Sequence, residues 1–216
     1  YVSEWIGHEV TRPISFTDLK SVVKIFSHIV DAKSSFTQEH SDGVANLARY
    51  VAELFKLPEL SCETLELAGL LHDIGKLRVP DGVLEKPGKL STPEFKSIQR
   101  HSFDTFNILR RIKGFESIAL WAGQHHERVG GDGYPYRQKE SKLSLEARIL
   151  AVADVFQALA QDRPYREALS PEVILSILKK DVDAGKLDRA VVNMIEENLQ
   201  ACWRAAVLKM DDTEKV

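Results

Sequence analysis

The sequence has 216 residues, of which 44% are hydrophobic and 28% are charged, and this is sufficient for one globular domain with a sizeable core. Its formal net charge of −3 excludes a strongly basic surface, so DNA and long RNA are not expected partners, whereas a small anionic ligand needs only local positive charge. The chain contains neither a long apolar span nor a signal peptide. We therefore expect a cytoplasmic chain without direct membrane contact.

The first residue and the two cysteines also bear on cellular context. The chain begins with Tyr1 rather than Met, so we expect a piece of a longer protein, whose parent could be membrane-anchored. Cys62 and Cys202 lie far apart and show no zinc-binding spacing. We expect both to be free thiols in the core, as in a reducing compartment.

Apolar residues recur at helical spacing through most of the chain. The stripes from Leu19 to Val30 and from Val44 to Phe55 predict two amphipathic helices. Ser91-Thr92-Pro93-Glu94 and Ser170-Pro171-Glu172 each offer a cap, an early proline and an acid that favour a helix start. Further helices are expected over residues 62–73, 115–126, 144–160, 171–182 and 188–209. Since no segment sustains an alternation of period two, the predicted fold class is all-α, with at most a short hairpin.

Two stretches interrupt the helical pattern with glycine and proline. They run from Gly75 to Gly88 and from Arg128 to Lys142. We predict that they form active-site loops, and the alternative is that the glycine-rich stretch is only a flexible surface connection.

Five histidines and two aspartates are predicted to point inward. His40 shares a helix face with Val44 and Leu47, and Asp73 ends an apolar helix, where a carboxylate without a cation is costly to bury. Each residue alone has a simpler explanation as a hydrogen-bonded core side chain. Together they predict a two-metal site between helices, with imidazole and carboxylate ligands that suit iron or manganese better than a structural zinc. The set comprises His40, His72, Asp73, His101, His125, His126 and Asp154.

The order and spacing of these motifs over residues 36–190 resemble the HD-GYP phosphodiesterases. The resemblance implies an HD-domain helical bundle with extra C-terminal helices and a glycine-rich GYP loop. This domain would occupy residues 36–216, and a helical extension or linker over residues 1–35 would precede it. The motifs are Leu71-His72-Asp73-Ile74-Gly75-Lys76, Val79-Pro80, Lys86-Pro87-Gly88-Lys89-Leu90, His101, His125-His126-Glu127-Arg128, Gly133-Tyr134-Pro135, Ala153-Asp154-Val155 and Asp162-Arg163-Pro164-Tyr165-Arg166.

The resemblance also implies a reaction. Two divalent ions, iron or manganese first and nickel, cobalt, magnesium or zinc as alternatives, would be bridged by a hydroxide and by Asp73. The remaining ligands would be His40, His72 and Asp154 for one ion, and His101, His125 and His126 for the other. The enzyme would hydrolyse a phosphodiester bond of cyclic di-GMP, giving pGpG and in some members GMP, with 3',3'-cyclic GMP-AMP as the alternative substrate.

Other residues are candidates for contacts with substrate or partners. Lys76 is placed to neutralise a phosphate oxygen, or else to cap a helix C-terminus. Arg163 and Arg166 are expected to grip phosphate or guanine edges, with plain surface solvation as the alternative. Tyr134 is expected to stack on a base or to shape the loop with Pro135. The resemblance further suggests that the GYP loop docks a diguanylate cyclase domain, and a homodimer is left open.

Three positions depart from the family pattern. Gly130 stands where the family usually has Asp, with Asp132 two residues later, and Gln157 replaces a common acid. Phe36 stands where some members have the Glu that supports a third metal, so two metals are predicted. Two other functions compete with the phosphodiesterase. One is an HD enzyme that hydrolyses a nucleotide mono- or triphosphate, and the other is a catalytically silent module that binds a cyclic dinucleotide or a protein.

Overall fold

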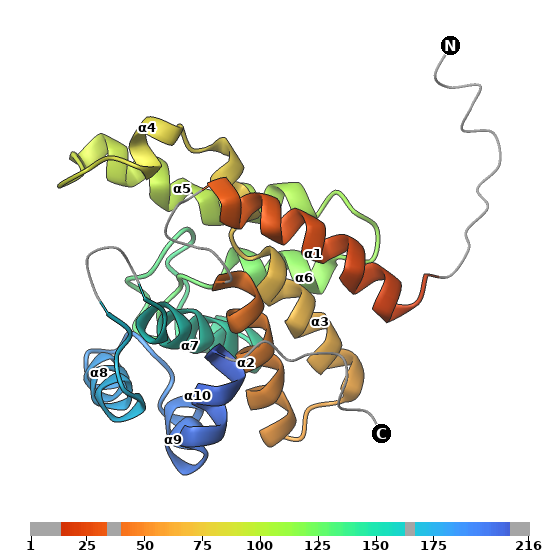
Figure 1. The fold of residues 1–216 in the computed structure, drawn as a ribbon, viewed down its shortest axis with the longest axis vertical. Coiled ribbons are helices and arrows are strands. Elements are labelled where there is room, and N and C mark those ends of the chain that lie inside the picture. The colour runs from red at the N-terminus through yellow and green to blue at the C-terminus, as the bar shows by residue number, and fades with distance from the viewer. Residues whose placement is uncertain (1–13, 34–39, 163–166, 208–216) are drawn as a thin grey trace.

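The computed structural model describes residues 14–33, 40–162 and 167–207, and this part of the chain contains helices and no strand (Figure 1). The all-α prediction is therefore confirmed, and no hairpin is present in the described residues. The α-helices and two 3-10 helices (η) are α1 (Phe16–Lys33), α2 (His40–Leu54), α3 (Glu59–Leu71), η2 (Ile74–Arg78), α4 (Asp81–Leu84), α5 (Thr92–Leu109), α6 (Glu116–Gly123), η3 (Glu140–Lys142), α7 (Leu145–Ala160), α8 (Pro171–Asp183), α9 (Arg189–Glu197) and α10 (Leu199–Val207).

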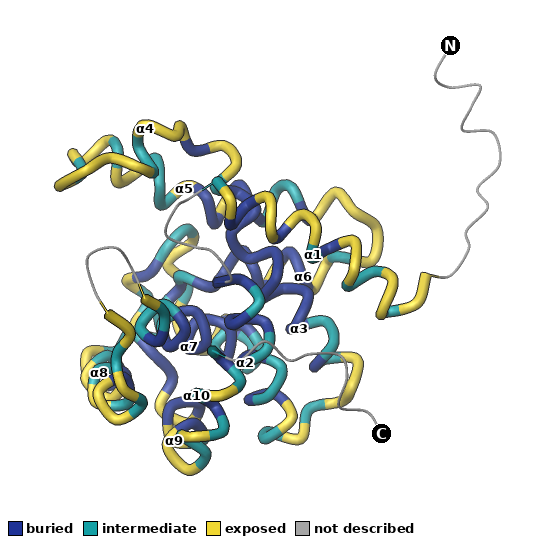
Figure 2. The backbone as a smooth tube through the Cα atoms, viewed as in Figure 1, coloured by how far each residue is buried: buried dark blue, intermediate teal, exposed yellow. Residues whose placement is uncertain are grey.

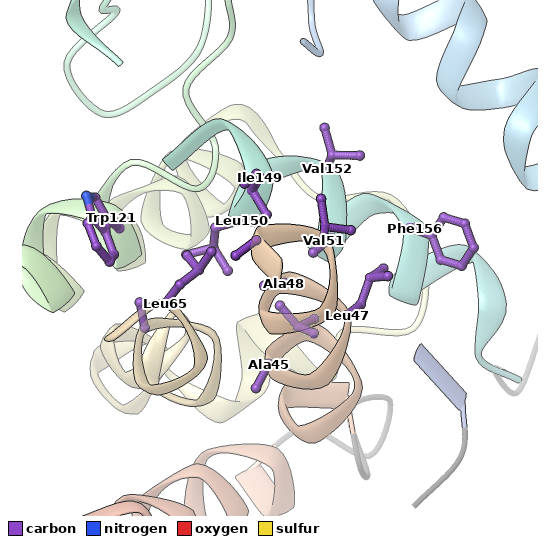
Figure 3. Close-up of a cluster of buried hydrophobic side chains, with 14 of the residues drawn as sticks. Ala45, Leu47, Ala48, Val51, Leu65, Trp121, Ile149, Leu150, Val152 and Phe156 are labelled. Carbon is purple, nitrogen blue, oxygen red and sulfur yellow. The ribbon is translucent and has the colours of Figure 1, made fainter. Parts of the chain in front are cut away.

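The core lies where α2, α3, α6 and α7 pack against one another, and the backbone there is almost continuously buried (Figure 2). Leu47 and Leu65 face Ile149, Leu150 and Phe156 across this interior, and all five side chains are fully buried (Figure 3). Burying a side chain of this size contributes about 1.5–3 kcal/mol. The same four helices carry or immediately precede most of the candidate metal ligands, so the core fixes the frame of the site.

Local signals account for several helix boundaries. The cap predicted at Ser91 is present in α5, where Ser91 and Glu94 form a reciprocal capping box. In α8 the Ser170 hydroxyl accepts a hydrogen bond from the backbone N–H of Val173. The helix predicted over residues 188–209 is instead two helices, because the chain leaves α9 at Asn198 before α10 begins. The Asn198 side chain donates to the carbonyl of Met194, a competing local bond that is typical of helix ends.

Helix α1 packs across α3, α2 and η2, but its predicted apolar stripe is only partly buried. Val23 and Val30 face the core, whereas Val22, Ile25 and Ile29 are exposed. The division of the chain at residue 35 stays a prediction. Among the described helices none has both the length and the apolar character needed to cross a bilayer. Cys62 and Cys202 are buried and free, as expected.

Candidate metal centre

The structure brings the seven candidate ligands together. They come from the start of α2, the end of α3, the middle of α5, the turn after α6, and α7. The ligand atoms of His40, His72 and Asp73 all lie within 4.8 Å of one another, and those of His101, His125 and His126 form a second such group. The two groups of donors therefore provide two places where a cation fits.

Asp73 belongs to the first group and also contacts the second. Its Oδ2 is 3.3 Å from Nε2 of His72, and its Oδ1 is 3.2 Å from Nε2 of His101. Asp154 makes a second connection, because its Oδ1 is 3.2 Å from Nε2 of His40 and its Oδ2 is 3.8 Å from Nδ1 of His126. Each carboxylate thus directs one oxygen toward each group.

Three of the histidines are oriented by their own helices. Nδ1 of His72 donates to the carbonyl of Gly69 at 2.7 Å, Nδ1 of His101 donates to Ile98 at 2.6 Å, and Nδ1 of His125 donates to Ala122 at 2.6 Å. Each acceptor is three residues earlier in the chain. A neutral ring with its proton on Nδ1 keeps the lone pair of Nε2 free to bind a cation, which is the usual arrangement of a metal-bound histidine.

The centre has an unmet need for positive charge. Nε2 of His72 and Oδ1 of Asp73 are buried, and neither has a hydrogen-bond partner within the described chain, although charged atoms stand within 4 Å of each. Buried polar atoms without partners are rare, and a cation between them would satisfy both. The residues present therefore fit a pair of divalent ions.

The protonation of the site is consistent with this need. Burial alone would raise the pKa of Asp73, but the neighbouring Lys76 and His72 hold that pKa well below its usual range. Burial would lower the pKa of His72, but Asp73 raises it to about 9. Burial and the adjacent imidazole of His126 hold the pKa of His125 far below its usual value. His125 is thus neutral at pH 7, while Asp73 remains ionised and attracts whatever positive charge is present.

The position of Asp73 depends on a close approach between η2 and α5. A Cβ on Gly75 would lie only 2.0 Å from the carbonyl oxygen of His101, so no larger residue fits without moving a helix. The Thr105 hydroxyl joins the same two segments, since it donates to the carbonyl of His72 at 2.9 Å and accepts from the N–H of Gly75 at 3.0 Å. These contacts bring His72 and Asp73 against His101.

Lys76 and Tyr134 lie at the edge of the centre. Nζ of Lys76 is 2.5 Å from Oδ2 of Asp73, so its bond goes to a site carboxylate rather than to the end of a helix. The Tyr134 ring is half-buried, with its centroid 4.7 Å from that of His126. Burial raises the pKa of Tyr134, with a further contribution from Asp154, so its hydroxyl stays protonated.

The loop over residues 128–142 is tied to the metal centre by Glu127, to which the sequence alone assigns no role. The buried carboxylate accepts from the N–H of Tyr136 at 2.6 Å and from that of Gln138 at 2.9 Å. Gly133 packs against the same turn, where a Cβ would lie 2.6 Å from the carbonyl of His126. These contacts join the loop to the turn that carries His125 and His126. The sequence signal that identifies Glu127 in retrospect is an acid directly after two candidate ligands and before a glycine-rich loop.

Two residues of the stretches that depart from the family pattern, Asp132 and Gln157, lie in the described part of the chain. Asp132 is exposed and pairs with Arg128 at 2.9 Å, so it does not take a place among the ligands. Gln157 is buried beside His40, with its Oε1 2.5 Å from Nδ1 of the imidazole. Phe36 and the predicted substrate contacts Arg163 and Arg166 lie outside the described residues.

Comparisons with known proteins agree with this architecture. The HD domain family matches residues 24–191. The 3'3'-cGAMP-specific phosphodiesterase 1 of Vibrio cholerae serotype O1 is 41% identical over 210 residues, which cover 94% of this chain and 49% of that protein. A cyclic di-GMP phosphodiesterase of Pseudomonas aeruginosa is 41% identical over 133 residues, which cover 61% of this chain and 32% of that protein.

A solved structure extends the likeness to the fold. The HD domain of the phosphodiesterase PgpH of L. monocytogenes, in complex with cyclic-di-AMP, superposes with a TM-score of 0.63 at 20% identity, covering 88% of this chain and 99% of that chain. The chain spans half or less of the length of the two curated relatives. With the matched family, the motif order and the converging ligands in agreement, the chain belongs to the HD domain family, in the HD-GYP group that its motifs predict.

Proposed function

We propose that this chain binds two divalent ions and hydrolyses a phosphodiester bond of a cyclic dinucleotide. The observation that carries the proposal is the position of Asp73, which directs one carboxylate oxygen toward each of two histidine groups while its Oδ1 is buried without a hydrogen bond among the described residues. A silent binding module has no need for such a complete and costly set of buried ligands.

The residues would divide between the ions as the motifs imply. His40, His72 and Asp154 would hold one, His101, His125 and His126 would hold the other, and Asp73 would contact both. When bound, such a pair supplies a nucleophilic water at neutral pH and positive charge around the phosphorus. The nitrogen and oxygen donors favour iron or manganese, with nickel, cobalt, magnesium and zinc as alternatives.

Two side chains would act on the substrate itself. The side chain of Lys76 is 20% exposed and pairs with a buried carboxylate, so its ammonium can turn toward a non-bridging phosphate oxygen without leaving Asp73. That charge would stabilise the transition state more than the ground state, since negative charge grows on those oxygens. Tyr134 would present its ring and protonated hydroxyl beside His126, where it would hold the nucleotide against the site.

The substrate class follows from the curated relatives, of which one acts on 3'3'-cGAMP and another on cyclic di-GMP. The test is to load the protein with Mn²⁺ or Fe²⁺, supply the two cyclic dinucleotides separately, and separate the products by chromatography. We expect at least one to be opened to its linear dinucleotide, and excess chelator to abolish the reaction. Two tightly bound ions with neither substrate opened would overturn the proposal. The homodimer and the docking of a diguanylate cyclase domain on the GYP loop stay predictions.

A further inference from the structure

One of the candidate ligands is oriented differently from three others. His72, His101 and His125 each donate their Nδ1 proton to a backbone carbonyl three residues earlier. His40 is the first residue of α2, so it has no preceding turn of that helix to offer such a carbonyl. Its Nδ1 instead lies 2.5 Å from the side-chain oxygen Oε1 of Gln157, which is 117 positions away in the sequence.

Gln157 is built into the core rather than resting on a surface. Its side chain is buried at 4% exposure, and it lies three residues after Asp154, on the same face of α7. Space for it is made by Gly43 of α2, where a Cβ would lie 2.8 Å from Cγ and 2.9 Å from Nε2 of Gln157. A methyl group at that position would push the amide away from its present place.

The direction of the amide decides which nitrogen of His40 is available. The oxygen Oε1 only accepts hydrogen bonds, so it keeps the proton on Nδ1 and leaves the lone pair on Nε2. That Nε2 faces the centre, 3.2 Å from Oδ1 of Asp154. If the amide presented its NH₂ group instead, Nδ1 would have to accept, and the proton would sit on Nε2, where it would exclude a metal.

We infer that Gln157 is a positioning residue for metal binding, which fixes His40 in the tautomer and orientation that one of the two ions requires. Through residues 154 and 157, a single turn of α7 thus supplies both a ligand and the side chain that orients the neighbouring ligand. The inference rests on the proposed two-metal function. It predicts a defect confined to the ion held by His40, because His101, His125 and His126 have no contact with Gln157 among the described interactions.

The test is a competitive titration of the metal-free chain with Mn²⁺ in the presence of a chelator of known affinity, for the wild type and three variants. Gln157→Leu keeps most of the volume and removes the acceptor, and Gln157→Glu keeps an acceptor. Asn198→Ala is the matched control, because among the described residues the side-chain amide of Asn198 bonds only to Met194, and Asn198 is remote in sequence from every candidate ligand. Loss of a side chain that orients a ligand typically weakens metal affinity about 10- to 100-fold.

We expect Gln157→Leu to weaken one of the two binding events by that factor and to leave the other unchanged. Gln157→Glu should bind both ions with affinities close to those of the wild type, and Asn198→Ala should match the wild type. Circular dichroism shows whether each variant is folded; if the Leu variant is not, Gln157→Met replaces it, since Met also lacks the oxygen acceptor. Two unchanged affinities in the Leu or Met variant, or a Glu variant as weak as the Leu variant, would overturn the inference while leaving the proposed reaction intact. A wild type that binds both ions tightly and cleaves neither substrate would overturn the reaction but not the role of Gln157.

Discussion

Among single residues, Asp73 has the largest predicted effect. Asp73→Asn keeps the shape of the side chain but removes the charge that both histidine groups face. We expect the bound metal to fall from two ions to one or none and kcat/KM to fall at least about 10³-fold, since the charge stabilisation that metals supply is worth several kcal/mol. Metal analysis and steady-state kinetics measure the two effects.

A second buried aspartate offers the matched control. Asp104 of α5 is 4% exposed and pairs with Arg78 and Arg100 outside the ligand set. Asp104→Asn should change stability but keep both ions. If Asp73→Asn retained full metal content and turnover, the assigned role of Asp73 would be wrong.

Lys76 should separate catalysis from metal binding. Lys76→Ala removes the ammonium that pairs with Asp73 but no ligand atom, so we expect metal content to be kept and kcat to fall about 10²- to 10³-fold, the range for losing one preorganised transition-state donor. Lys179→Ala, which breaks an exposed pair with Glu196, should leave kcat unchanged. A Lys76→Ala enzyme of normal kcat would show that this lysine only balances the charge of Asp73.

The identities of the candidate ligands were easier to predict than their hydrogen-bond partners. The seven candidate ligands could be named because burying several imidazoles and carboxylates on apolar helix faces is costly without a cation. The acceptor of the His40 Nδ1 proton could not, because Gln157 and His40 are 117 positions apart and only the packing of α7 against α2 brings them together. Glu127 belongs to the His-His-Glu-Arg motif, but its bonds to Tyr136 and Gln138 depend on how the loop over residues 128–142 folds back toward Glu127.

At the scale of elements, the contact between η2 and α5 is the most constrained. In Gly75→Ala the new methyl group would lie 2.0 Å from the carbonyl oxygen of His101, so the two segments must separate. Overpacking of this kind costs about 1–3 kcal/mol. We expect a lower free energy of unfolding and weaker metal binding in the same variant, because the displacement moves Asp73 away from His101. Denaturant titration and metal analysis test the two parts.

Gly82 in α4 supplies the comparison for this prediction. A Cβ there meets no atom within 4 Å, and the residue is helical. Gly82→Ala should therefore be neutral or stabilising by up to about 1 kcal/mol, with metal content unchanged. Equal effects of the two substitutions would show that the close packing at Gly75 does not matter.

Helix boundaries show where local patterns were sufficient. The starts of α5 and α8 follow directly from Ser91 and Ser170, whose hydroxyls cap their own helices. The break at Asn198 was missed because apolar spacing continues across it, and the exposed half of the stripe on α1 was missed because periodicity does not say what covers a face.

At the scale of the whole molecule, the metal centre joins parts of the chain that local structure does not hold together. The candidate ligands from His40 to Asp154 meet only because α2, α3, α5, α6 and α7 are packed together. A cation bound between them therefore acts as a cross-link in the folded state, and the unfolded chain has no equivalent site. The stability of the fold and the occupancy of the centre should be coupled.

Removal of metal tests this coupling. An ion at 100 times its dissociation constant stabilises the folded state by about 2.7 kcal/mol. For a chain of this size, that amounts to a rise in Tm of roughly 5–10 °C. We expect calorimetry to show a rise of this order when Mn²⁺ is added to the metal-free chain, and excess chelator to reverse it. In Asp73→Asn the shift should be much smaller, because the charge that draws both ions into the core is missing. A wild-type Tm that does not respond to Mn²⁺ would mean that the chain reaches its folded state without the ions. The negative charge of the buried carboxylates would then be balanced by Lys76 and the protonated His72 alone.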